Sequence, residues 1–256
     1  YFIIQTLAAA MILFASTLNA WQTGHWAITY PTCPLTTTII TTAIMMKLGA
    51  APLHLWYPEI MQGATLNTAL IISTWQKIAP MSMLYMMHKN LPTTLVLLTG
   101  LLSTLIGGWA GLNQTQTRKI LAHSSIVHMG WLLIALAMDT ALATLTLALY
   151  ILMTTAMFTS LNTTSTKTIT DMGTTWSASP TLLTLSMLTL TSLGGLPPMT
   201  GFTPKLLILN DLSMNHLLPL ATLIALATLP SLFFYVRMAY MTTLTTPPTT
   251  TNTKYT

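Results

Sequence analysis

The chain has 256 residues, only 5% of them charged, and a formal net charge of +5. An ordinary soluble domain carries about 25% charged residues, so the composition excludes a soluble globular protein and predicts an integral membrane protein. The single cysteine excludes an internal disulfide framework and a multi-cysteine metal or cluster site, and the thinly spread positive charge excludes a nucleic-acid-binding surface.

Apolar stretches long enough to cross a bilayer, about 20 residues each, follow one another along almost the whole sequence. No stretch between them is long enough for a soluble domain. We therefore expect an all-α protein, a polytopic transmembrane helical bundle, with residues 1–244 as a single domain and residues 245–256 as a polar tail. Its eight or nine expected membrane segments are residues 2–18, 35–55, 64–87, 91–112, 119–137, 140–161, 181–196, 201–212 and 216–241.

The connectors between these segments are polar and short, with two exceptions. Residues 19–34 contain Trp21 and Trp26, which are typical of a membrane–water boundary. Residues 162–180 form the longest polar stretch and are the expected place for contacts outside the bilayer. The chain starts at Tyr1, already inside an apolar run, so we expect it to be a fragment of a longer protein.

Three lysines lie inside the apolar stretches, and each lies close to a helix breaker. A charge at the centre of a membrane helix costs about 2.5–3.5 kcal/mol, and only 9 residues of the chain are Lys or Arg. Broken helices are tolerated at membrane depth only where protein or a water-filled cavity meets the freed backbone groups. The pattern predicts discontinuous helices around an ion path at Lys47 before Gly49 and Pro52, Lys77 before Pro80, and Lys205 after Gly201 and Pro204.

Lysine is the residue type that suits proton transfer in such a path. Burial weakens its preference for the charged form, so a buried lysine can take up and release a proton, whereas an arginine stays protonated. The alternative is that a lysine extends its side chain to the membrane surface. Lys205 is most open to this alternative, because its segment is short, and Lys77 is least open to it.

Four more polar residues are candidates for the same path. Glu59 follows the first broken segment and either pairs with a lysine or is an ordinary boundary charge. Ser124, Ser125 and His128 share one helix face, and histidine titrates near physiological pH. They form either a proton relay or a packing face that hydrogen-bonds across helices. We expect no metal site, because His123 and His128 have no further ligands near them in the sequence.

The run from Lys47 to Glu59, KLGAAPLHLWYPE, resembles the signature of the antiporter-like subunits of respiratory complex I. Further stretches are similar to the chain 2 family of mitochondrial NADH:ubiquinone oxidoreductase. These are TWQKIAP at residues 74–80, GLNQTQ at 111–116 with the basic pair at 118–119, and GGLPPMTGF at 194–202 followed by Pro204 and Lys205. Together they cover nearly the whole chain in order.

This resemblance implies a discontinuous-helix, antiporter-like fold and a core membrane-arm subunit of complex I. Such a subunit translocates protons across the mitochondrial inner membrane while electrons pass from NADH to ubiquinone elsewhere in the complex. Its implied partners are membrane lipids and other membrane-arm subunits, including neighbouring antiporter-like ones. NADH, FMN, iron–sulfur clusters and ubiquinone are implied to be used by other subunits, with no cofactor in this chain.

The resemblance also implies roles for individual residues. The family's mid-membrane lysines match Lys47, Lys77 and Lys205, the same positions that the helix breakers select. The family also pairs its first lysine with a glutamate on an earlier helix, and no acidic residue precedes Glu59 here, so that partner is expected in sequence outside this chain. His123 stands where relatives commonly carry tyrosine.

Two other functions fit the same sequence. A freestanding secondary cation/proton antiporter also uses broken helices, and it would act as a single chain in liposomes. A purely structural membrane subunit would use its lysines only to pair with neighbours, so that lysine substitutions would harm assembly and leave pumping unchanged.

Overall fold

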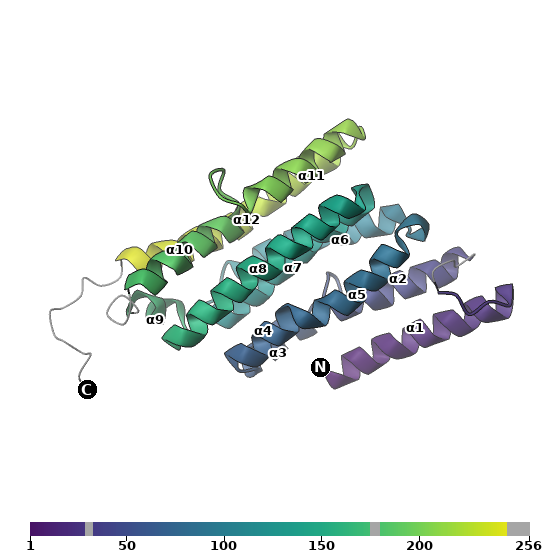
Figure 1. Ribbon diagram of the computed structural model, residues 1–256, viewed down its shortest axis with the longest axis horizontal. Helices are drawn as coiled ribbons and strands as arrows, with labels where there is room; N and C mark the ends of the chain where they lie inside the picture. The colour runs from purple at the N-terminus through teal and green to yellow at the C-terminus, as the bar shows by residue number, and fades with distance from the viewer. Residues whose placement is uncertain (29–32, 175–179, 245–256) are drawn as a thin grey trace.

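The computed structural model describes residues 1–28, 33–174 and 180–244. The named elements in this part are all helices, and they run side by side along one common direction (Figure 1). Within the described ranges, five are long and apolar enough to cross a membrane. They are α1 (Phe2–Thr23), α6 (Thr93–Gly111), α7 (Thr117–Met138), α8 (Thr140–Thr164) and α12 (Leu218–Leu244).

The remaining apolar stretches are pairs of shorter helices, as the helix breakers predict. In Figure 1 the two members of the last pair lie end to end. The pairs are α2 (Pro34–Leu48) with α3 (Trp56–Gly63), α4 (Leu66–Ser73) with α5 (Trp75–Met86), and α10 (Pro180–Gly194) with α11 (Phe202–Met214). Two small elements complete the set, η1 (His88–Asn90) and α9 (Ile169–Thr174).

The backbone groups freed between α2 and α3 find partners within the protein. Gly49, at φ +71°, ends α2, and the N–H of Ala50 donates to the Met45 carbonyl at 3.0 Å. The N–H of Ala51 donates to Ser103 Oγ at 2.9 Å. This is the condition under which a broken helix is tolerated at membrane depth.

Two expectations about the broken helices are wrong in detail. Residues 56–63, expected as a loop, form α3, because Pro58 lies in the first turn, where no intrahelical N–H donor is needed. Pro80 does not interrupt its helix but lies inside α5. The break falls at Thr74, whose hydroxyl and N–H both donate to the Leu70 carbonyl, at 2.7 and 3.0 Å.

Boundaries also differ from the expected ones in the two longer connectors. α1 continues to Thr23 and α8 to Thr164, so each helix extends into a connector whose polar sequence predicts a loop. Part of both connectors and the tail at 245–256 lie outside the described residues. The division into one membrane domain and a tail stays a prediction.

α7 is the centre of the bundle. α3, α4, α6, α8, α11 and α12 all contact it, and Ser124 and Ser125 on it are fully or almost fully buried, at 0% and 1% exposed. Close approach to α6 depends on glycine, because a Cβ atom added to Gly130 would lie 2.6 Å from the Gly100 carbonyl oxygen. The polar face of α7 therefore points into protein and not toward lipid.

Candidate functional site

Lys77 is the most deeply buried of the three lysines, with 3% of its surface exposed. Its Nζ donates to Ser125 Oγ on α7 and, at 3.0 Å, to the Tyr150 hydroxyl on α8. It also lies 4.9 Å from the ring centroids of both Tyr57 and Tyr150. A desolvated contact of a cation with an aromatic face stabilises by about 2 kcal/mol. Among the described residues no carboxylate pairs with Lys77, so hydroxyls and aromatic rings bind its ammonium group in place of a carboxylate.

The hydroxyls of Tyr57, Ser125 and Tyr150 form one connected network with the Ser73 carbonyl. We call these four residues the Lys77 cage. Ser125 Oγ donates to the Tyr57 hydroxyl at 3.1 Å. The Tyr150 hydroxyl lies 3.1 Å from Ser125 Oγ and donates to the Ser73 carbonyl at 2.9 Å. The cage therefore joins α3, α4, α7 and α8 at the point where α4 ends.

Lys205 binds at a second helix break. Its Nζ reaches back from α11 and donates to the Gly194 carbonyl, the last of α10, at 3.0 Å. Gly195 follows in a left-handed conformation, at φ +80°, and a Cβ atom added there would lie 2.8 Å from Lys205 Nζ. The turn after α10 is thus shaped to leave room for the ammonium group.

A small cavity of about 20 Å³ lies between α7, α8 and α11. His128, Tyr150 and Lys205 are among the residues that line it. This volume holds about one water molecule. The His128 ring lies 5.6 Å from the Tyr150 ring, centroid to centroid, and its Nε2 lies 3.4 Å from the Tyr235 hydroxyl.

Lys47 lies in the last turn of α2, half-buried beside the first break. Its Nζ has no hydrogen-bond or ion-pair partner among the residues that the structure describes, so no hydrogen bond joins it to the Lys77 cage. The geometry thus brings Lys77 and Lys205 to the same tyrosine, Tyr150, and leaves Lys47 apart.

The three lysines share one relation to the breaks. Lys47 is in the last turn of α2, Lys205 binds the last carbonyl of α10, and Lys77 reaches the last carbonyl of α4 through Tyr150. A helix carries a partial negative charge at its C-terminal end, and half-helix ends hold cations in membrane transporters. The interrupted helices therefore supply negative potential where carboxylates are scarce.

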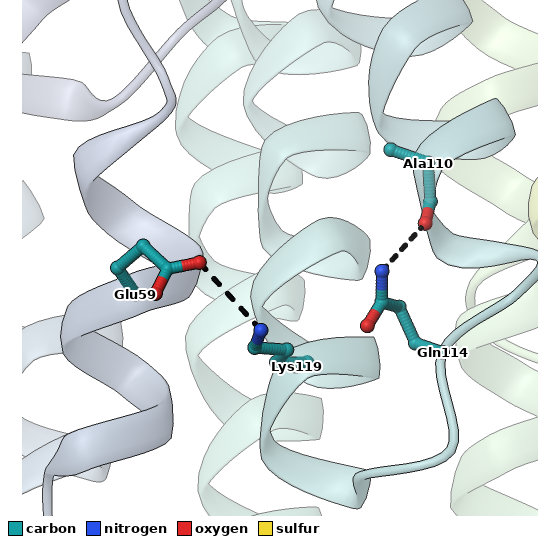
Figure 2. A network of polar contacts seen from close by, with 4 residues as sticks. All are labelled: Glu59, Ala110, Gln114 and Lys119. Carbon is teal, nitrogen blue, oxygen red and sulfur yellow. Dashed lines mark hydrogen bonds and ion pairs between the residues drawn. The ribbon is translucent and has the colours of Figure 1, made fainter.

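Glu59 does not join this arrangement. Its Oε1 lies 3.6 Å from Lys119 Nζ, and its side chain is 72% exposed. Figure 2 shows this pair beside the bond from Gln114 Nε2 to the Ala110 carbonyl, 3.3 Å long. Exposed pairs contribute about 0–1 kcal/mol. The geometry favours the boundary-charge interpretation of Glu59 over pairing with a lysine inside the bundle.

The expected Ser124–Ser125–His128 face divides into separate environments. Ser125 contacts Lys77, and His128 lies beside Tyr150 and the cavity. Ser124 is buried but makes no hydrogen bond to Lys77 or to another member of the cage. Tyr57 and Tyr150 are not among the site residues that the sequence predicts. The available signal is that Tyr150 is a polar aromatic residue in a span otherwise rich in Leu, Ala and Thr.

The sequence matches the family model for transmembrane subunits of NADH:quinone oxidoreductase and Mrp antiporters over residues 1–231. It is 54% identical over 248 residues to NADH-ubiquinone oxidoreductase chain 2 of Tetraodon nigroviridis, covering 97% of this chain and 71% of the relative. It is 52% identical over 252 residues to chain 2 of Xenopus laevis, covering 98% and 73%.

Solved structures share the fold. A chain of respiratory complex I from Thermus thermophilus aligns with a TM-score of 0.87 and 25% identity over 94% of this chain. A chain of the Mrp complex from Dietzia aligns with a TM-score of 0.86 and 16% identity over 97% of this chain, which shows the fold alone. The present chain spans 58% and 51% of the lengths of these two chains. The prediction of an antiporter-like bundle with discontinuous helices is confirmed.

Proposed function

The chain belongs to the NADH:quinone oxidoreductase/Mrp antiporter transmembrane family, and from this premise we propose that it is a proton-translocating subunit of the membrane arm of respiratory NADH:ubiquinone oxidoreductase. It works as a multi-pass protein of the mitochondrial inner membrane, in contact with other membrane-arm subunits and with lipid. As part of that translocase it moves protons while electrons pass from NADH to ubiquinone elsewhere in the complex.

The observation that carries this proposal is the environment of Lys77. An ammonium group is held in the bundle by neutral hydroxyls and aromatic rings, at the end of an interrupted helix. A carboxylate beside Lys77 would favour its protonated form. This environment has no such charge among the described residues, so Lys77 can exist both as the ammonium and as the neutral amine. The amine form can accept a hydrogen bond from the Tyr150 hydroxyl in place of donating one.

The cofactors of the reaction belong to the rest of the complex in this proposal. NADH, FMN, iron–sulfur clusters and ubiquinone are bound by other subunits, and this chain supplies protonatable groups only. Lys47, Lys77 and Lys205 are its main proton carriers, with Ser125 and His128 beside them. Ser124 and Glu59 have lesser parts, as packing and boundary residues.

Replacing Lys205 by methionine tests this function. The substitution keeps an unbranched side chain of similar length but removes the group that binds the Gly194 carbonyl and lines the cavity. In the assembled complex we expect NADH-driven proton pumping in liposomes to fall by about 10²–10⁴-fold, the range for a lost proton-transfer group. The matched control is Lys89→Met, because Lys89 is exposed in η1.

The same experiment separates the proposed function from its rivals. If Lys205→Met lowers only the amount of assembled complex and leaves pumping per complex unchanged, the chain is a structural subunit. Cation/proton exchange by the isolated full-length protein in liposomes would instead identify a freestanding antiporter.

Gly195→Ala tests the position of Lys205 without removing its charge. An alanine at φ +80° costs about 1–2 kcal/mol, and its Cβ atom would lie 2.8 Å from Lys205 Nζ. We expect assembly to weaken and pumping per complex to fall several-fold. Gly24→Ala is the control, because Gly24 has φ +74° after α1 but open space around it. Equal pumping by the two variants would show that the position of Lys205 does not matter.

A further inference from the structure

Tyr150 is the one cage residue that also lines the cavity beside His128 and Lys205. Its hydroxyl binds Lys77 Nζ at 3.0 Å, and its ring lies against the ring of His128. It is 2% exposed, so its position is set by the surrounding helices and not by solvent. No other described residue both hydrogen-bonds to Lys77 and lines this cavity.

The other hydroxyl that binds Lys77, on Ser125, reaches the cavity only through Tyr150. Ser125 accepts from Lys77 and donates to the Tyr57 hydroxyl at 3.1 Å. Tyr57 comes from α3 and is not among the residues that line the cavity. Ser125 Oγ also lies 3.1 Å from the Tyr150 hydroxyl, so a proton that leaves Lys77 through Ser125 either stops at Tyr57 or passes to Tyr150.

We propose that Tyr150 is a relay residue that passes protons between Lys77 and the cavity beside His128 and Lys205. This inference rests on the proposed function and names a carrier that neither the sequence motifs nor the comparisons assign. It explains how Lys77 and Lys205, on different broken helices, exchange protons although no hydrogen bond joins them.

The transfer uses one water molecule in the cavity, which has room for about one. The hydroxyl hydrogen of Tyr150 turns from the Ser73 carbonyl toward this water. The O–H bond of Tyr150 then breaks as its proton passes to the water, and an N–H bond of Lys77 breaks as its proton restores the hydroxyl. The water gives its extra proton to the neutral amine of Lys205. One proton has moved from the ammonium of Lys77 to Lys205, and Tyr150 and the water are unchanged.

Phenylalanine at position 150 tests the relay. It keeps the ring that contacts Lys77 and His128 but removes the oxygen that carries the proton. In the assembled complex we expect Tyr150→Phe to lower NADH-driven pumping at least about tenfold. The rate is expressed per complex, measured on native gels, so that a change in assembly does not affect it. If phenylalanine prevents assembly, Tyr150→Met provides a flexible side chain that fills the space without a hydroxyl.

Tyr57→Phe is the matched variant. Tyr57 is 1% exposed, and its ring centroid lies at the same 4.9 Å from Lys77 Nζ. Its hydroxyl binds Ser125 but does not line the cavity, so its loss disturbs the cage without removing the link to the cavity, and we expect a smaller loss of pumping than in Tyr150→Phe. Equal losses in Tyr57→Phe and Tyr150→Phe would mean that the cage only positions Lys77, and the relay would be rejected.

The Lys77→Met complex distinguishes failure of the relay from failure of the proposed function. If Tyr150→Phe pumps normally and Lys77→Met does not, the proposed function stands and Tyr150 is not a carrier. If both pump normally, the proposed function itself is wrong. Slowing of pumping by D₂O should be larger in wild type than in Tyr150→Phe, because the variant lacks the exchangeable hydroxyl.

Discussion

Lys77→Met is expected to abolish NADH-driven proton pumping while the complex still assembles. The methionine fills most of the volume of the lysine side chain, and the cage hydroxyls keep their bonds to one another and to the Ser73 carbonyl. A buried charge that costs about 2.5–3.5 kcal/mol in a membrane is removed, so assembly should not suffer. Loss of the proton-binding group lowers the rate by about 10²–10⁴-fold.

Two comparisons make this result specific. Lys119→Met removes a lysine whose partner Glu59 is 72% exposed, and it should change pumping by less than about twofold, because exposed pairs contribute little. Lys77→Arg keeps the positive charge but cannot release a proton. We expect Lys77→Arg to pump as poorly as Lys77→Met. Normal pumping by the arginine variant would show that only the charge is needed and would contradict proton transfer through Lys77.

Much of the site is predictable because the features with the largest free-energy cost, charges inside apolar stretches, are visible in the sequence. Lysines inside apolar stretches are rare, and glycine and proline beside them mark helix breaks, so Lys47 and Lys205 and the breaks near them could be located from residue types alone. The sequence also indicates Lys77, although Pro80 predicts the break at the wrong place. In the structure the break is at Thr74.

The partners of these lysines could not be read in the same way. Ser125 and Tyr150 lie 48 and 73 positions from Lys77, and Tyr57 lies on another helix. Only the packing of α3, α7 and α8 brings them to Lys77. A tyrosine in an apolar helix is common in packed cores, so residue type alone does not mark it. Glu59 shows the opposite case, because a lone glutamate near a break attracts attention but binds Lys119 at an exposed end of the bundle.

Gly130→Ala should prevent normal assembly of the complex. A Cβ atom there would lie 2.6 Å from the Gly100 carbonyl oxygen and 2.7 Å from Thr104 Cγ2. Neither neighbour can move freely, because the first is backbone and the second is a fully buried side chain. α6 and α7 would have to separate, and overpacking of this kind costs about 1–3 kcal/mol. We expect the amount of assembled complex on native gels to fall about tenfold or more.

Gly63→Ala is the control that isolates packing from helix propensity. Gly63 is also helical, at the end of α3, and no heavy atom lies within 4 Å of an added Cβ. Alanine favours the helix over glycine by about 1 kcal/mol at both positions, so propensity alone predicts that both variants gain stability. The contact of Gly130 with α6 predicts instead that Gly130→Ala loses stability while Gly63→Ala gains it. Normal assembly of Gly130→Ala would therefore mean that α6 and α7 lie farther apart than described, and Ser125 and His128, which α7 carries, would no longer be fixed against Lys77 and Tyr150.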